Sequence, residues 1–258
     1  WLNYLDVQDN FNPEVGFVQR RGVRVTKAYL GPTPRPGRAR IRLMEPMIVL
    51  TYITDQQNRI VGRTQHYMVG TRLEDDSYIN VIYQRNLDVL DEPFDIQDDV
   101  SIPEGTYAYD EWNLSYSTNP AARVYGSARY EPMEFYGGHR NGVGGSIGFR
   151  ASTQLSTEFS YERNDVDLPA GDFLTHLAIL RADYAFSPRA TLRTLVQYNS
   201  STHDVTSSVR FNFIHRPGSD LYIVYNGLDR TRMPGDIEEA FTPSDRQLAI
   251  KFSYLLSR

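Results

Sequence analysis

Apolar and polar residues alternate along most of this chain of 258 residues. Such alternation predicts β-strands with one apolar and one polar face, because successive side chains of a strand point to opposite sides. No window of a dozen residues repeats its apolar positions with the spacing of a helix. The pattern therefore predicts an all-β protein. Its clearest strand is 247–258, where every second residue is apolar: Leu248, Ile250, Phe252, Tyr254 and Leu256.

The predicted strands are long. Alternation extends over roughly 10–14 residues in most segments, whereas strands of globular proteins average about 5–6 residues. We count about 13 strands from Gly22 onward and a partial strand at 1–7, which gives about 14. Single-chain bacterial outer-membrane barrels have an even number of strands. The first strand begins abruptly at Trp1, which leaves open a larger barrel with strands upstream.

The connections between the predicted strands alternate in length. Short turns at one end and long loops at the other are typical of outer-membrane barrels, and aromatic residues cluster near the strand ends, as in membrane interfaces. We therefore predict a single domain over 1–258, an antiparallel up-and-down transmembrane β-barrel located in the bacterial outer membrane. The short set is 31–38, 74–77, 119–122, 152–154, 187–189 and 216–220, and the long set is 55–60, 88–105, 137–142, 164–172, 199–204 and 226–245.

Composition is compatible with this prediction. The chain has no cysteine, which excludes disulfides and cysteine-ligated metals. Its longest apolar run, 47–53, is too short for a spanning helix, which needs about 20 residues. Hydrophobic residues make up 40% of the chain, the mean hydropathy is −0.48 and the net charge is −5. Spanning strands spread their lipid-facing residues over alternate positions, so a barrel can have this ordinary composition.

Charged residues stand at the centres of several predicted strands, on the polar faces. A charge that faced lipid would cost about 2–4 kcal/mol at the midplane, so the membrane prediction places these side chains inside. Paired with one another they would close the lumen, and unpaired they would line a wet channel. The predicted lumen-lining residues are Arg150, Glu158, Glu162, Arg181, Asp183, Arg193, Arg210 and Lys251.

Motifs for catalysis, metals or cofactors are missing from the sequence. The five histidines lack metal-ligand spacing, and there is no nucleophile motif, so we predict no cofactor and no enzyme activity. Segment 137–145 is predicted to be a hairpin turn at Asn141-Gly142. The acidic segment 88–104 is predicted to be a hydrated outer loop, with weak divalent-cation binding as the alternative. Basic segment 20–42 is predicted to face the lumen or lipid headgroups rather than nucleic acid, because the chain is acidic.

Four sequence strings resemble a known family: 10–22 (NFNPEVGFVQRRG), 195–202 (LVQYNSST), 207–226 (SSVRFNFIHRPGSDLYIVYN) and 247–256 (QLAIKFSYLL). They are similar to the C-terminal barrel domain, of unknown function, in bacterial surface proteins that usually carry an upstream family-9-like carbohydrate-binding module. The resemblance implies outer-membrane lipid as a partner and a link to carbohydrate binding or uptake through that module. It implies no catalytic residues.

Three functions stay open at this point. The first is a porin-like pore or surface anchor in the outer membrane. The second is a soluble all-β glycan-binding module, in which exposed tyrosine and tryptophan side chains stack on sugars. The third is a hydrolase embedded in the barrel, for which His203 with Asp204, and His139, are the candidates at the long-loop rim.

Overall fold

The computed structural model of the protein describes residues 1–12, 14, 20–97, 100–231 and 241–255. The described residues contain β-strands and no helix, so the all-β prediction is confirmed. The strands are β1 (Leu2–Val7), β2 (Val23–Leu30), β3 (Ile41–Asp55), β4 (Ile60–Leu73), β5 (Tyr78–Leu90), β6 (Phe94–Gln97), β7 (Val100–Ile102), β8 (Gly105–Ser117), β9 (Val124–Phe135), β10 (Gly138–Arg150), β11 (Leu155–Leu168), β12 (Gly171–Ser187), β13 (Ala190–Asn199), β14 (Asp204–Arg216), β15 (Ser219–Thr231) and β16 (Phe241–Ser253).

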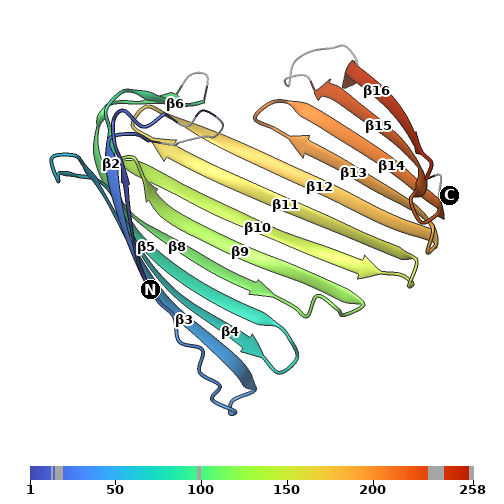
Figure 1. Cartoon of the computed structure of the whole chain (residues 1–258), viewed down its shortest axis with the longest axis horizontal. Helices are drawn as coiled ribbons and strands as arrows, with labels where there is room; N and C mark the ends of the chain where they lie inside the picture. The colour runs from blue at the N-terminus through green and yellow to red at the C-terminus, as the bar shows by residue number, and fades with distance from the viewer. Residues whose placement is uncertain (13, 15–19, 98–99, 232–240, 256–258) are drawn as a thin grey trace. The chain divides into compact units, whose positions relative to one another are not determined.

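Within the described part of the chain, one antiparallel sheet contains 14 strands. Its order is β1-β2-β3-β4-β5-β8-β9-β10-β11-β12-β13-β14-β15-β16, so each strand pairs with the next one in sequence (Figure 1). Strands β6 and β7 interrupt this order only as a separate two-stranded sheet. Strand β12 has 17 residues and β13 has 10. The predicted up-and-down order, strand number and strand length are confirmed.

The register gives the sheet one apolar and one polar face. Directly opposite residues of an antiparallel pair lie on the same face. In β2–β8 one such row joins Leu30, Ile48, Tyr67, Tyr83 and Trp112. In β12–β16 another row joins Tyr184, Leu192, Phe211, Ile223 and Ile250.

The described residues form two compact units. Unit 1 contains 1–117, 129–142 and 165–173, and unit 2 contains 118–128, 143–164 and 174–258. Unit 1 has a small apolar cluster of its own, in which Val100, Val166 and Leu168 are buried and are contacted by Ile96, Phe135, Tyr136 and Phe173. This cluster holds the β6–β7 hairpin against the end of β11.

Turn 74–77 shows how local side chains end a strand. The Asp75 carboxylate accepts hydrogen bonds from the Ser77 hydroxyl at 2.6 Å and from the Ser77 backbone N–H at 3.0 Å. These bonds lower the pKa of Asp75 because they favour its charged form. Asp76 takes a positive φ of 67°. The turn lies where it was predicted, between β4 and β5.

Two predicted long connections are wrong. Between β9 and β10 the turn is Tyr136-Gly137, with φ values of 44° and 85°, and Asn141-Gly142 lies inside β10. Two positive φ values in succession are those of a tight hairpin turn. Between β11 and β12 only residues 169–170 remain outside the strands. The connection with the acidic segment 88–104 is long, as predicted, and it contains the β6–β7 hairpin, which was not predicted.

Some predicted features lie outside the described residues. They include Leu256 of the last predicted strand, residues 232–240 of the connection 226–245, and positions 13 and 15–19 of the first string of the family resemblance. The described part of β16 begins at Phe241 and ends at Ser253, so this strand starts earlier than the alternation predicted.

Candidate functional site

The polar face of unit 2 brings together the residues that were predicted to line a lumen. Asp183 lies opposite Arg193, and Arg193 lies opposite Arg210. The row continues to Val224 and Ala249, two residues before Lys251. These side chains therefore share a face of the sheet, as the alternation predicted, while their exposure to a lumen stays a prediction.

The remaining predicted residues lie on the strands that precede this row. Arg181 is two positions before Asp183 and its guanidinium lies 3.4 Å from the Glu158 carboxylate. Glu162 follows four positions after Glu158 and accepts a hydrogen bond from Asn164 at 3.0 Å. Arg150 donates a hydrogen bond to the Ala122 carbonyl at 2.9 Å and lies over the Tyr125 ring.

Unit 1 has a polar-face network across three neighbouring strands. The His66 ring nitrogen Nδ1 lies 2.7 Å from Gln84 Oε1, and Gln84 donates to the Glu111 carboxylate at 2.9 Å. The three residues occupy one row of the register between β4, β5 and β8. His66 therefore lies on the polar face of β4, in a row of hydrogen-bonding side chains.

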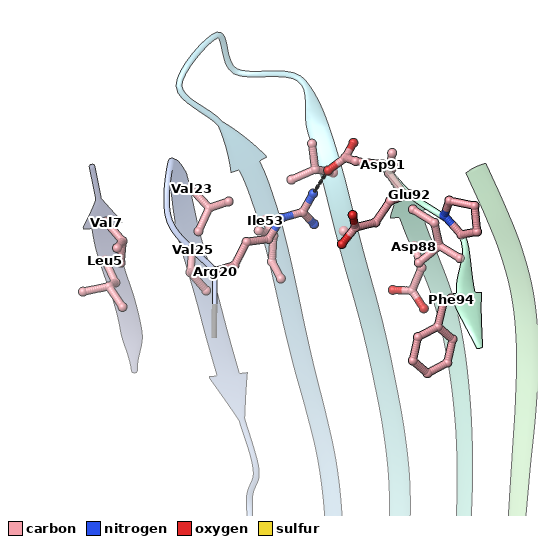
Figure 2. Close-up of a pocket in the computed structure, with 15 residues that line it drawn as sticks. Leu5, Val7, Arg20, Val23, Val25, Ile53, Asp88, Asp91, Glu92 and Phe94 are labelled. Carbon is pink, nitrogen blue, oxygen red and sulfur yellow. Dashed lines mark hydrogen bonds and ion pairs between the residues drawn. The ribbon is translucent and has the colours of Figure 1, made fainter. Parts of the chain in front are cut away.

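A cavity of unit 1 has a volume of about 950 Å³ and lies near the connections β1–β2 and β5–β6 (Figure 2). Its floor is apolar, although it lies on the face that is polar elsewhere in the sheet. By the register, Leu5 opposes Val25, Val25 opposes Ile53, and Val7 opposes Val23. An apolar floor of this kind can hold the hydrocarbon part of a small molecule.

Charged side chains form the rim of this cavity. Arg20 reaches across to Asp91, with 2.7 Å between the guanidinium and the carboxylate (Figure 2). Glu92 and Asp88 line the same cavity. An apolar floor beneath a charged rim suits an amphipathic molecule. A sequence signal for this floor was missed, because Val23 and Val25 are apolar at the two positions that precede Lys27 on the same face of β2.

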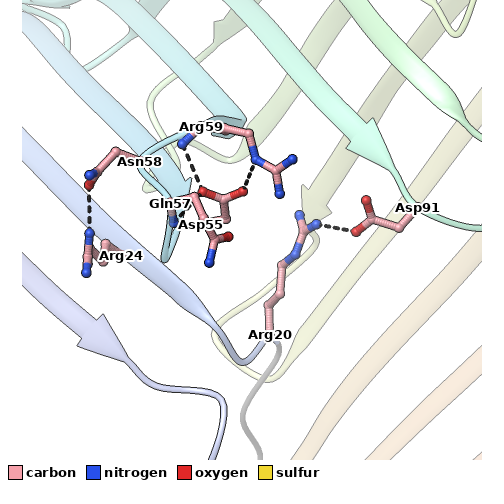
Figure 3. Close-up of polar contacts among 7 residues, drawn as sticks. All are labelled: Arg20, Arg24, Asp55, Gln57, Asn58, Arg59 and Asp91. Atoms are coloured by element: carbon pink, nitrogen blue, oxygen red, sulfur yellow. Dashed lines mark hydrogen bonds and ion pairs between the residues drawn. The ribbon is translucent and has the colours of Figure 1, made fainter.

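A polar cluster adjoins this cavity at the turn between β3 and β4 (Figure 3). The Asp55 carboxylate accepts from the backbone N–H groups of Gln57 and Arg59 at 2.9 and 2.8 Å, and Arg59 Nε lies 2.5 Å from it. Arg24 donates to Asn58 Oδ1 at 2.6 Å. These bonds fix the turn and leave Arg20 as the cation shared by the turn cavity and the apolar cavity.

Three arginines of the basic segment 20–42 form ion pairs. Arg20, Arg24 and Arg42 are paired with Asp91, Asp6 and Asp76 respectively. Arg24 lies on the apolar face, in register with Thr54, whereas Lys27 lies on the polar face, in register with Thr51. Lys27 therefore lies on the face that was predicted to surround the lumen, and Arg24 lies on the face that was predicted to meet lipid.

Asp88 is the best-connected acidic residue of the segment 88–104. It accepts hydrogen bonds from the hydroxyls of Tyr109 at 2.7 Å and Tyr136 at 3.2 Å. The carboxylate thus joins β5 to β8 and to the β9–β10 turn. Among the residues that the structure describes, no group of three or more acidic or histidine side chains is arranged to hold a metal ion.

We expect Asp88→Ala to destabilise this end of unit 1 by about 1–3 kcal/mol, because two partly buried tyrosine hydroxyls lose their acceptor. Urea unfolding followed by intrinsic fluorescence measures the change. Asp91→Asn is the matched control, since the Asp91 side chain is 74% exposed and its ion pair contributes little. Equal effects of the two substitutions would contradict the assigned role of Asp88.

The hydrolase candidates lie in different units of the described chain. His139 lies in β10 and belongs to unit 1, whereas His203 lies in the β13–β14 turn and belongs to unit 2. His203 takes a positive φ of 52°. Its neighbour Asp204 begins β14. The hydrolase alternative stays a prediction.

In the part of the chain that the structure describes, no helix has the length and apolar character required to cross a membrane. No family model, curated protein or solved structure matches the chain. The resemblance to the barrel domain of bacterial surface proteins therefore stays a prediction from the sequence strings.

Proposed function

We propose that this chain is the membrane-spanning part of an outer-membrane β-barrel, in which the apolar face contacts lipid and the polar face surrounds an aqueous interior. The exposed apolar face supports this proposal most. Leu248, Ile250 and Phe252 of β16 are 65%, 65% and 67% exposed. In β12, Leu180 is 48% exposed. A water-soluble monomer rarely exposes contiguous apolar patches larger than a few hundred Å².

The opposite face supports the same assignment by its charges. Ion pairs such as Arg181–Glu158 and Arg193–Asp183 stand at interior positions of the strands. Hydrocarbon would penalise these groups strongly, whereas an aqueous interior hydrates them. The sheet thus has one face suited to lipid and one suited to water. In a soluble protein, by contrast, other protein elements would have to cover the apolar face of the sheet.

The biochemical role that we propose is that of a pore or a surface anchor. A pore is favoured by the polar face, whose charged side chains can interact with solutes. An anchor is favoured by the family resemblance, in which an upstream carbohydrate-binding module would be held at the cell surface. In both roles the partner of the apolar face is outer-membrane lipid.

Cell fractionation tests the proposal. We expect the full chain, expressed with an export signal in a bacterium that has an outer membrane, to be recovered in the outer-membrane fraction and to require detergent for extraction. A folded barrel is also expected to change its gel mobility on heating. Recovery of folded protein in the soluble fraction, with no heat-dependent mobility, would contradict the proposal and favour the soluble glycan-binding alternative.

A further inference from the structure

Two arginines, Arg193 and Arg210, lie directly opposite each other on the neighbouring strands β13 and β14. The register places Asp183 opposite Arg193 and Arg193 opposite Arg210. On the other side of Arg210, the row continues with Val224 and Ala249, which carry no charge. One carboxylate therefore stands beside two guanidinium groups in this row.

The single carboxylate does not neutralise both arginines. Arg193 Nε lies 3.5 Å from Asp183 Oδ1, and their side chains are 70% and 54% exposed. Among the described residues, no carboxylate lies within ion-pairing distance of Arg210. Like charges directly opposite each other destabilise a sheet. An anion that binds both guanidinium groups would remove this repulsion.

A cavity opens beside Arg193, one member of the arginine pair. It has a volume of about 430 Å³ and lies in unit 2, beside the β10–β11 and β12–β13 turns. Arg193 and Arg150 contribute cationic groups to its lining, and Asp183 contributes the carboxylate. The lining also contains side chains that can donate hydrogen bonds, namely Ser152, Thr153, Gln154, Ser156 and Thr191.

We propose that Arg193 and Arg210 together bind a small oxyanion of the phosphate class on the polar face, next to the cavity that Arg193 lines. Guanidinium groups present paired N–H donors that match phosphate oxygens. Thr191 lies two positions before Arg193 on the same face and supplies a hydroxyl donor to the site. Asp183 competes with the anion for Arg193. The site does not rest on the proposed membrane location, because all its groups belong to unit 2.

Binding of inorganic phosphate to the full chain tests the site, with chloride used to keep the ionic strength constant. The protein can be kept in buffer or in neutral detergent, so failure of the membrane proposal leaves the test intact. We expect saturable binding by equilibrium dialysis. We also expect a rise in Tm of about 3–6 °C at ten times the Kd.

Four variants make the test specific. Arg193→Gln and Arg210→Gln are each expected to weaken phosphate binding at least tenfold. Asp183→Asn is expected to strengthen it severalfold, because the competing carboxylate is removed. Arg35→Gln is the control, since it removes a cation from an exposed connection of unit 1 and should leave binding unchanged.

Several results would overturn the proposal. One is binding of phosphate to the unsubstituted chain that does not saturate. Another is a phosphate affinity in both arginine variants equal to that of the unsubstituted chain. The others are weaker phosphate binding in Asp183→Asn, and a loss of binding in Arg35→Gln as large as in the arginine variants. Micelles that contain an anionic phospholipid, tested without free phosphate, separate the two sources of a phosphate group. A rise in Tm with these micelles, but not with inorganic phosphate, would assign the arginines to lipid headgroups and overturn the soluble-anion site. If Arg193→Gln fails to fold, dialysis with Arg210→Gln and Asp183→Asn decides.

Discussion

Leu180→Arg is expected to destabilise the folded protein in a bilayer by about 2–4 kcal/mol. Leu180 lies in β12, is 48% exposed, and is opposite Val196 on the apolar face. It lies near the middle of a strand of 17 residues, where the proposed barrel would be surrounded by hydrocarbon. An arginine there must lose its hydration or distort the bilayer to keep it.

Ile179→Arg is the matched control for this prediction. Ile179 is the preceding residue, has a similar volume, and receives the same new side chain. It lies opposite Gln197 on the polar face, so its arginine would project into water. We expect this substitution to change the stability by less than about 1 kcal/mol, as surface substitutions do.

Urea unfolding in lipid vesicles, together with the yield in the outer-membrane fraction, measures both variants. The free energy of unfolding should fall for Leu180→Arg and stay nearly constant for Ile179→Arg. A soluble sheet predicts the reverse order of outcomes, because an exposed apolar residue tolerates arginine in water. Equal stability of the two variants would thus contradict the assignment of the apolar face to lipid.

Strand positions and faces could be predicted from the sequence because side-chain alternation is a local property with a period of two. The row of Asp183, Arg193 and Arg210 shows what side-chain alternation can predict and what it cannot. Alternation correctly placed the three residues on one face. It did not show that the two arginines are directly opposite, because register depends on the turns and the pairing partners.

The turn between β9 and β10 shows why other features could not be predicted. Asn141-Gly142 has the residues that favour positive φ, yet the turn is Tyr136-Gly137. The Tyr136 ring packs against Phe135, with 4.9 Å between the ring centroids, and its hydroxyl donates to Asp88. These contacts fix Tyr136 at a φ that is unfavourable for a tyrosine. Distant partners therefore determined the turn.

The candidate cavity of unit 1 was missed for a similar reason. Its apolar floor comes from three neighbouring strands whose residues are far apart in sequence, such as Leu5, Val25 and Ile53. Each of them alone reads as an ordinary strand residue. Only the pairing of β1 with β2 and of β2 with β3 makes them one surface.

The β6–β7 hairpin was hidden by the acidic residues around it. Its apolar positions are few, and they become a cluster only when Val100 meets Val166 and Leu168 of β11. Ile102 is 2% exposed, so the hairpin is firmly packed despite its acidic composition. Val100 is buried by Val166, which lies more than 60 positions away in the sequence. Such burial leaves no local signal in the sequence of the hairpin.

Val166→Asp is expected to release the β6–β7 hairpin from the end of β11. Val166 is 3% exposed and lies between Val100 and Leu168 in the apolar cluster. A carboxylate there would be buried without a partner, which costs several kcal/mol, more than the packing of one short hairpin can offset. The long strands keep their pairing, so the loss is local.

Limited proteolysis measures this release. We expect cleavage between 94 and 102 to become at least tenfold faster in Val166→Asp, while the circular dichroism of the sheet is retained. Phe94→Asp is the control, because it adds the same carboxylate to the same hairpin at a side chain that is 50% exposed.

Val166 lies on the same face of β11 as Glu162, so the hairpin packs on the polar face, which is the interior face of the proposed barrel. Its release should therefore also raise the conductance of the protein in planar bilayers, and unchanged proteolysis would show that the apolar cluster does not hold the hairpin.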